Sequence, residues 1–287
     1  MIADGAANLI RDAFDNPDLL HGLPRIAKRI VQWGADALPV TLEHSAVVVS
    51  EEQLLAGLGN ADPTDLVPDW TIHSASAPST CAMDQRFGSR MASAVAVQLR
   101  DSAAANACWI ESTENGWLFV ITIAPGSAWL IAVGGDPVEM LGNSQLVVGQ
   151  IERIGSHGVR FPCSPRMLSP VCGPDWLACG SAAMAFDPIC GDGTAHAVRE
   201  AILASAVLRA AASGGDQSAL LRHYQSRLMA GFRKHLEMCR GFYESGGESP
   251  WWKEQTQAAC DGIAWCNRQP PPANAFRLNG FDLEPVS

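Results

Sequence analysis

The stretch Asp175-Trp-Leu-Ala-Cys179, followed by Gly180-Ser-Ala-Ala-Met-Ala-Phe-Asp187-Pro188-Ile-Cys-Gly191-Asp-Gly193 and an alanine-rich run from Thr194 to Ala212, decides the fold. The short apolar run that stops at Gly180 is typical of a buried strand. Pro188, Gly191 and Gly193 indicate a tight turn that is bare of side chains. The last part predicts an amphipathic helix that begins near Thr194. Its predicted buried stripe comprises Val198, Ala201, Ile202, Ser205 and Leu208.

A turn of this kind in front of a helix has a chemical use. The first turn of a helix has backbone N–H groups without intrahelical partners, and the helix dipole is positive there. Bare glycines let a ligand approach the backbone closely, so a phosphate or the electron-rich edge of a heterocycle would be held well. The alternative is a tight strand-to-helix connection that binds nothing.

The spacing Gly180-Ser-Ala-Ala, then Asp187-Pro188-x-x-Gly191-x-Gly193 and an alanine-rich helix, resembles the second flavin-binding motif of FAD-dependent oxidoreductases. The resemblance is to the p-hydroxybenzoate-hydroxylase and tryptophan-halogenase-like branch. It implies an α+β fold, a reduced form of the glutathione-reductase-like FAD fold, and FAD as cofactor. It assigns cofactor contacts to Gly180, Ser181, Asp187, Pro188, Gly191, Asp192, Gly193 and Thr194.

Two departures from this pattern argue against tight binding of FAD. Ser181 stands where the family has an aspartate, and a hydroxyl supplies no acidic acceptor for the ribityl chain. No Gly-x-Gly-x-x-Gly motif, which would cradle the pyrophosphate, follows a predicted strand in this sequence. The chain is therefore expected to lack the N-terminal dinucleotide-binding unit, and a partner chain would supply it if FAD is bound.

The resemblance divides the chain into three segments. Residues 1–80 are expected to be a remnant of the FAD-binding domain, with helices up to residue 38 and strands at 44–49 and 69–74. Residues 81–170 are expected to form an antiparallel substrate-domain sheet, because strand patterns at 92–99, 107–111, 117–123, 128–133 and 145–148 alternate with turn residues. Residues 171–287 contain the second motif, a long helix with an apolar stripe after Gly215, and a further helical region.

Composition limits the classes of partner. The net charge is −10, and no cluster of Lys and Arg suits a nucleic-acid surface. No secretory pattern or long apolar segment occurs, so a cytoplasmic location without membrane contact is expected. None of the nine cysteines forms a Cys-x-x-Cys pair, so no metal site is expected. Cys190, at the predicted helix start, is a weak candidate for a redox role, and turn packing is the alternative.

The predicted sheet contains the candidate substrate contacts Trp117 and Trp129, and Arg166 follows it. A surface salt bridge is the alternative for Arg166. Halogenases carry Trp-x-Trp-x-Ile-Pro where this chain has Trp117-Leu-Phe-Val-Ile-Thr122, and their catalytic lysine has no counterpart here, so halogenation is argued against.

We therefore expect an FAD-linked oxidoreductase or monooxygenase-like protein that holds a small organic substrate between the flavin and the sheet. His196 is a weak candidate for an acid or base near the ring, and a packed or solvent-facing histidine is the alternative. A hypothesis from another class is a cofactor-free accessory or small-molecule-binding protein derived from a flavoprotein. A third is a fragment that needs a partner chain to complete its FAD site.

Overall fold

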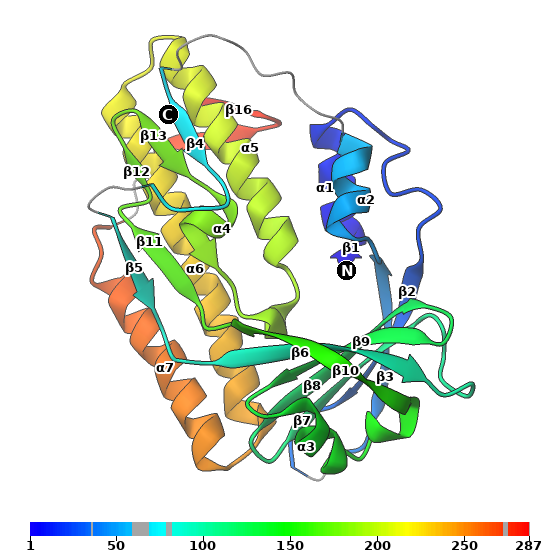
Figure 1. The fold of residues 1–287 in the computed structure, drawn as a ribbon. Coiled ribbons are helices and arrows are strands. Elements are labelled where there is room, and N and C mark those ends of the chain that lie inside the picture. The colour runs from blue at the N-terminus through cyan, green and yellow to red at the C-terminus, as the bar shows by residue number, and fades with distance from the viewer. Residues whose placement is uncertain (36, 59–68, 79–81, 272–274, 287) are drawn as a thin grey trace. The chain divides into compact units, whose positions relative to one another are not determined.

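The structure is a computed structural model that describes residues 1–287 except 36, 59–68, 79–81, 272–274 and 287 (Figure 1). It is a mixed α/β fold that separates into two compact units. Unit 1 comprises residues 1–60, 88–164 and 239–258, and unit 2 comprises 61–87, 165–238 and 259–287. Among the described residues, no helix combines the length and apolar character needed to span a membrane.

Unit 1 is built on an eight-stranded sheet with the order β1-β3-β2-β7-β8-β9-β6-β10. All neighbours are antiparallel except β2 and β7, which run parallel. The strands are β1 (Ile2–Ala3), β2 (Arg25–Gln32), β3 (Val40–Val47), β6 (Met91–Leu99), β7 (Ala107–Thr113), β8 (Gly116–Ala124), β9 (Ser127–Val133) and β10 (Ile151–Pro162).

Three helices and a 3-10 turn complete the first two segments of unit 1: α1 (Asp4–Ala13), α2 (Glu51–Leu58), α3 (Pro137–Gly142) and η1 (Val148–Gln150). Ser50 and Gln53 form a capping box at the start of α2, because each accepts a hydrogen bond from the other's backbone N–H. Asp136 caps α3 by accepting from two backbone N–H groups. One face of the sheet is packed with aliphatic side chains such as Val97, Leu118 and Leu130.

Unit 2 contains two small three-stranded sheets, ordered β14-β11-β5 and β12-β13-β4. Their strands are β4 (Thr71–His73), β5 (Met83–Arg86), β11 (Arg166–Ser169), β12 (Cys172–Gly173), β13 (Trp176–Ala178) and β14 (Met184–Ala185). The helices, two of which continue into unit 1, and the remaining elements are α4 (Gly180–Ala183), η2 (Pro188–Cys190), α5 (Gly193–Ala212), α6 (Gln217–Gly246), α7 (Pro250–Asn267), β15 (Phe276–Asn279) and β16 (Asp282–Pro285).

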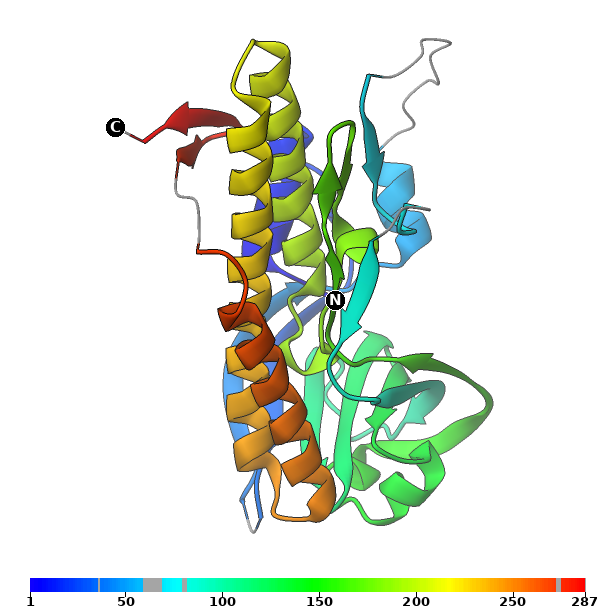
Figure 2. The same cartoon turned by 90° about the vertical axis from the view of Figure 1, so that its left-hand side faces the viewer.

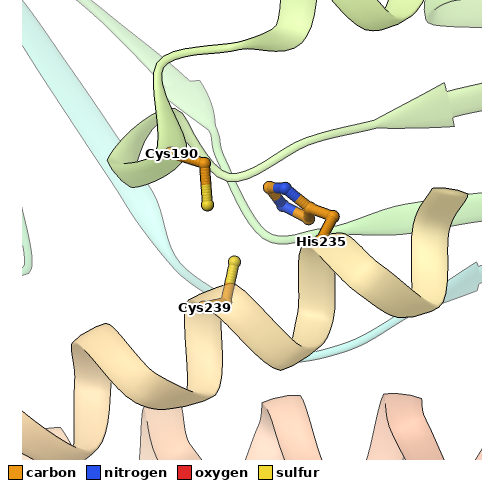
Figure 3. A group of neighbouring side chains, drawn as sticks. All are labelled: Cys190, His235 and Cys239. Atoms are coloured by element: carbon orange, nitrogen blue, oxygen red, sulfur yellow. The ribbon is translucent and has the colours of Figure 1, made fainter.

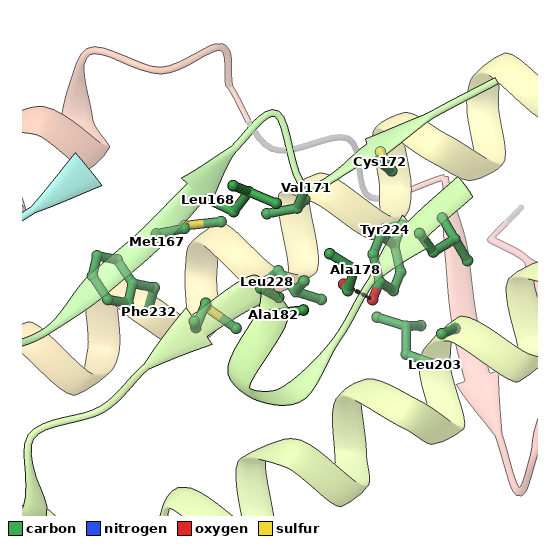
Figure 4. Close-up of a cluster of buried hydrophobic side chains, with 14 of the residues drawn as sticks. Met167, Leu168, Val171, Cys172, Ala178, Ala182, Leu203, Tyr224, Leu228 and Phe232 are labelled. Atoms are coloured by element: carbon green, nitrogen blue, oxygen red, sulfur yellow. Dashed lines mark hydrogen bonds between the residues drawn. The ribbon is translucent and has the colours of Figure 1, made fainter. Parts of the chain in front are cut away.

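The core of unit 2 joins the small sheets to α5 and α6, which lie side by side (Figures 1, 2 and 4). Leu203 comes from α5, and Tyr224, Leu228 and Phe232 come from one stripe of α6. The Tyr224 hydroxyl donates to the carbonyl oxygen of Ala178 in β13 at 2.6 Å, which satisfies the one polar group of this side chain. The long helix predicted after Gly215 and its apolar stripe are therefore confirmed.

Two predictions of local structure are wrong, and one strand was not predicted. Residues 25–32 form β2 rather than a helix, since Ile26 and Ile30, four residues apart, share one face of a strand as well as one face of a helix. No strand forms at 145–148, because the N–H groups of Gln145 and Val147 donate to the Glu111 carboxylate. The strand at 151–162 was missed.

The helix that begins at Gly193 is confirmed, but its predicted buried stripe is wrong. The buried positions of α5 are Ala195, Glu200, Leu203, Ala204, Ala206 and Val207, whereas Ala201 is exposed. Apolar residues occur all round this alanine-rich helix, so periodicity does not define the packed face.

The two units divide the chain differently from the three predicted segments. Strands β2 and β3, placed by prediction in an FAD-domain remnant, pair within the same sheet as β6–β10. The predicted boundary at residue 80 and the segment 59–68 lie outside the described residues.

Candidate functional site

The predicted strand, turn and helix are present in unit 2. Strand β13 pairs in parallel with β4, and the chain then turns at Gly180, whose φ of 54° is in the left-handed region that favours glycine. The N–H of Gly180 donates to Oε2 of Glu200 at 2.7 Å. The Glu200 side chain therefore links Gly180, the first residue of the motif, to helix α5.

Asp187 faces inward and holds the shape of the turn. It is 1% exposed, and its Oδ1 accepts a hydrogen bond from the N–H of Ile189 at 3.1 Å. Its own N–H donates to Nε2 of His235 on α6 at 2.8 Å. Pro188 then opens η2, where its fixed φ suits the first position of a helical turn. The shape of the turn thus depends on the buried side chain of Asp187.

The backbone between η2 and α5 is open. Gly191 has a φ of 67°, and a Cβ built at Gly191 or Gly193 would meet no heavy atom within 4 Å. Among the described residues no side chain caps the start of α5, so the positive end of its dipole faces this open space. The arrangement suits an electron-rich ring edge or an anion, and a planar flavin ring fits this description.

Asp192, the N-cap residue of α5, pairs with His196 in the first turn of that helix. Nε2 of His196 is 3.0 Å from Oδ2 of Asp192, and the hydrogen bond from His196 is the main reason why the Asp192 pKa is lowered. The His196 ring stacks on Phe186 at 4.3 Å between centroids, and the His235 ring meets the same phenyl edge-on at 4.8 Å. His196 is thus oriented by a carboxylate and an aromatic ring, and its role as an acid or base stays a prediction.

Glu200 is the most perturbed carboxyl group near the motif. It is 5% exposed, and burial raises its pKa to about 8, against which the Gly180 hydrogen bond acts. Its second oxygen, Oε1, is buried without a hydrogen-bond partner. Sequence analysis did not single out Glu200. The available signal was a lone acidic residue within the alanine-rich stretch that forms α5.

Cys190 belongs to a group of three side chains. Its Sγ, a ring nitrogen of His235 and Sγ of Cys239 all lie within 4.8 Å of one another (Figure 3). His235 and Cys239 are one turn apart on α6, which continues without a break across the boundary between the units. Sequence analysis missed His235, since 45 residues separate it from Cys190 and no short motif joins them.

Arg166 is engaged in an ion pair. Its guanidinium group lies 3.0 Å from Oδ1 of Asp84 and also donates to the backbone carbonyl of Ser181. The salt bridge weighed from the sequence is therefore present, and it lies next to the motif residue Ser181. A role in substrate binding stays a prediction.

The two candidate tryptophans lie on one face of the sheet in unit 1, at different depths. Trp117 pairs with Val133, and Ile121 pairs with Trp129, so these side chains share a face two rows apart. At about 3.4 Å per residue, the rows of Trp117 and Trp129 are separated by about 14 Å along the strands. Trp117 is 1% exposed and Trp129 is 39% exposed. A small molecule would therefore contact Trp129 far more readily than Trp117.

Two cavities lie elsewhere in the described parts of the chain. One of about 530 Å³ in unit 2 is lined by Arg222 and Arg233 of α6, among others. One of about 440 Å³ in unit 1 is lined by Arg90 and Trp251, among others. Within the residues that the structure describes, neither is lined by the turn at 187–194.

Comparisons with known proteins place this geometry in a known fold. No protein-family model and no curated protein sequence matches the chain. The flavin-dependent halogenase CmlS superposes with a TM-score of 0.73 at 14% identity, over 92% of this chain and 62% of that one. QhpG, a peptidyl tryptophan dihydroxylase, superposes with a TM-score of 0.73 at 16% identity, over 99% of this chain and 77% of QhpG. Klebsiella pneumoniae HpxO, solved with FAD and uric acid, superposes with a TM-score of 0.61 at 13% identity, over 93% of this chain and 86% of HpxO.

The chain spans 62% of the length of CmlS and 77% of the length of QhpG. At identities of 12 to 16%, the likeness shows the fold alone. The resemblance found in the second motif is confirmed at this level. The chain has the mixed α/β fold of the flavin-dependent halogenases and of the FAD-containing HpxO.

Proposed function

We propose that the protein is a flavin-linked oxidoreductase, monooxygenase-like in its chemistry, that acts on a small organic substrate. The observation that carries the proposal is the open, side-chain-free backbone at the start of α5, in a chain with the fold of flavin-dependent enzymes. The ring would be held by backbone N–H groups of Gly191, Gly193 and Thr194. Bound FAD would supply the hydride and oxygen chemistry.

The chain's own residues would position the cofactor and exclude water. Asp187 keeps the turn in its open shape from within, and Glu200 fixes the glycine at the start of the motif. Ser181, in the place of the usual aspartate, would offer one hydroxyl to the ribityl chain. His196, oriented by Asp192, would hold or release a proton beside the ring.

The substrate would lie at the exposed end of the sheet face in unit 1. Trp129 and Ile121 are direct neighbours there, and Ala96 pairs with Trp129 from the next strand. This row offers an apolar floor with one large aromatic side chain, which suits a flat organic molecule. Halogenation is not proposed, since Thr122 replaces the motif's proline and donates its hydroxyl to the carbonyl of Ala107.

A pair of glycine substitutions tests the proposal. Gly193→Val would place a branched side chain in the open space at the start of α5 and should reduce FAD affinity at least tenfold, measured by quenching of flavin fluorescence. Gly5→Val in the first turn of α1 is the matched control, since a Cβ there also meets no heavy atom within 4 Å. Its FAD affinity should equal that of the wild type.

Equal FAD binding by the wild type and Gly193→Val would contradict the placement of the ring at this turn. A wild type that takes up no FAD would favour the cofactor-free accessory protein. The specific observations behind that second candidate are Ser181 at the aspartate position and the absence of a Gly-x-Gly-x-x-Gly motif. Uptake only in the presence of a second chain would favour a divided FAD site.

A further inference from the structure

The cluster of Cys190, His235 and Cys239 has no role in the function proposed above. Cys190 ends the η2 turn, and the other two residues are neighbours on one face of α6, four residues apart. Figure 3 shows the three side chains pointing toward one another, and their ligand-type atoms lie within 4.8 Å of one another. The local geometry therefore brings two thiols and an imidazole together from positions that are distant in sequence.

The hydrogen bonding of His235 disfavours a metal in this cluster. Its Nε2 accepts the N–H of Asp187 at 2.8 Å, so the lone pair of that nitrogen is used. A neutral imidazole with an accepting Nε2 carries its proton on Nδ1 and has no second lone pair to offer. The ring instead brings an N–H donor to the cluster beside the two sulfur atoms.

The two thiols differ in their access to solvent. Cys190 is half-buried, whereas Cys239 and His235 are fully buried. A dissolved oxidant would therefore meet Cys190 first, while Cys239 would be protected from it and held beside the first sulfur. This is the arrangement of an attacking thiol and a resolving thiol.

We propose that Cys190 and Cys239 are a redox-active dithiol that a hydroperoxide converts into a reversible disulfide. The Cys190 thiolate attacks one peroxide oxygen, the O–O bond breaks, and Cys190 becomes a sulfenic acid while the released alkoxide or hydroxide takes up a proton and leaves as an alcohol or water. The Cys239 sulfur then attacks the Cys190 sulfur, the S–O bond breaks, and the hydroxyl group leaves as water with the proton of the Cys239 thiol. Two thiols and one hydroperoxide thus give one disulfide, one alcohol or water from the peroxide, and one further water.

Other cysteines of the chain provide a contrast within the same molecule. Burial raises the pKa of Cys172, Cys179 and Cys266 to about 11, so they are present as unreactive thiols at neutral pH. None of these three belongs to the cluster around His235. The inference does not depend on flavin binding, because the oxidant comes from solution.

The test uses the full chain, hydrogen peroxide as oxidant and mass spectrometry of its peptides. The wild type should yield a linked Cys190–Cys239 peptide that dithiothreitol separates again. In Cys239→Ser, oxidation should stop at a sulfenic acid on Cys190, which dimedone traps. Cys190→Ser should leave Cys239 unmodified. The control Cys179→Ser should still form the linked peptide.

Three results would overturn the proposal. The first is a wild type without the linked peptide at peroxide levels that oxidise its methionines, a result that needs no variant to fold. The second is a Cys239→Ser protein in which dimedone labels other cysteines as readily as Cys190. The third is stoichiometric zinc in native mass spectra of the wild type that is lost in Cys190→Ser, which would make the cluster a metal site.

Discussion

The substitution Glu200→Gln probes the buried carboxyl group that anchors the second motif. Glutamine has nearly the same size and keeps an oxygen that accepts from the Gly180 N–H, while it removes the titrating group. The folded state raises the pKa of Glu200 from 4.5 to about 8. Between these values the folded protein keeps a proton that the unfolded chain has lost, so the free energy of unfolding falls as pH rises.

The magnitude follows from the size of the pKa shift. At about 1.4 kcal/mol per pKa unit, the raised pKa of Glu200 lowers the free energy of unfolding by on the order of 3 kcal/mol at pH 7 and 5 kcal/mol above pH 8. At pH 5 the difference falls to about 0.8 kcal/mol, since the unfolded carboxyl group, with a pKa of 4.5, is then only partly protonated. The variant should therefore come within about 1 kcal/mol of the wild type at pH 5 and exceed its stability by several kcal/mol at pH 9.

Urea unfolding of both proteins from pH 5 to pH 9 measures this difference. Glu114→Gln, in an exposed turn of unit 1, is the control and should track the wild type at every pH. A stability difference between Glu200→Gln and the wild type that stays constant with pH would refute the reasoning. It would mean that the carboxyl group is already ionised in the folded protein.

Three smaller predictions concern stability and are checked by urea unfolding. Tyr224→Phe should cost about 1 to 3 kcal/mol, because it leaves a buried carbonyl of β13 without its donor, and an unchanged midpoint would contradict this. Ser50→Ala should cost about 1 kcal/mol by removing the capping box of α2, with amide exchange in that helix rising more than elsewhere. Glu111→Ala should cost about 3 kcal/mol, because it leaves the backbone N–H groups of Gln145 and Val147 without their acceptor, and amide exchange at these two residues should rise.

The parts of the fold that depend on neighbouring residues were predictable from the sequence. The strands around Trp117 and Trp129 are joined by short turns, and their alternation sets their faces without distant information. The capping box at Ser50 and the turn between Pro188 and Gly193 also follow from local chemistry. The motif that suggested a flavoprotein fold is of this local kind.

The parts that depend on distant partners were not predictable. The stretch from Ile26 to Val31 has spacing that suits a helix or a strand, and its pairing with β3 and β7 decides between them. The packed face of α5 is set by α6 and the small sheets, so the burial of Glu200 has no local signature. The contact of His235 with Asp187 joins positions 48 residues apart, which a single sequence does not reveal.

The stoichiometry of FAD on the purified chain tests the central claim most directly. The protein is incubated with FAD, freed of unbound cofactor by gel filtration, and its absorbance is recorded across the flavin bands. The open backbone at the start of α5 predicts about one FAD per chain, with bands shifted from those of free FAD. A colourless protein that retains no flavin would contradict the account and leave a flavoprotein fold without its cofactor.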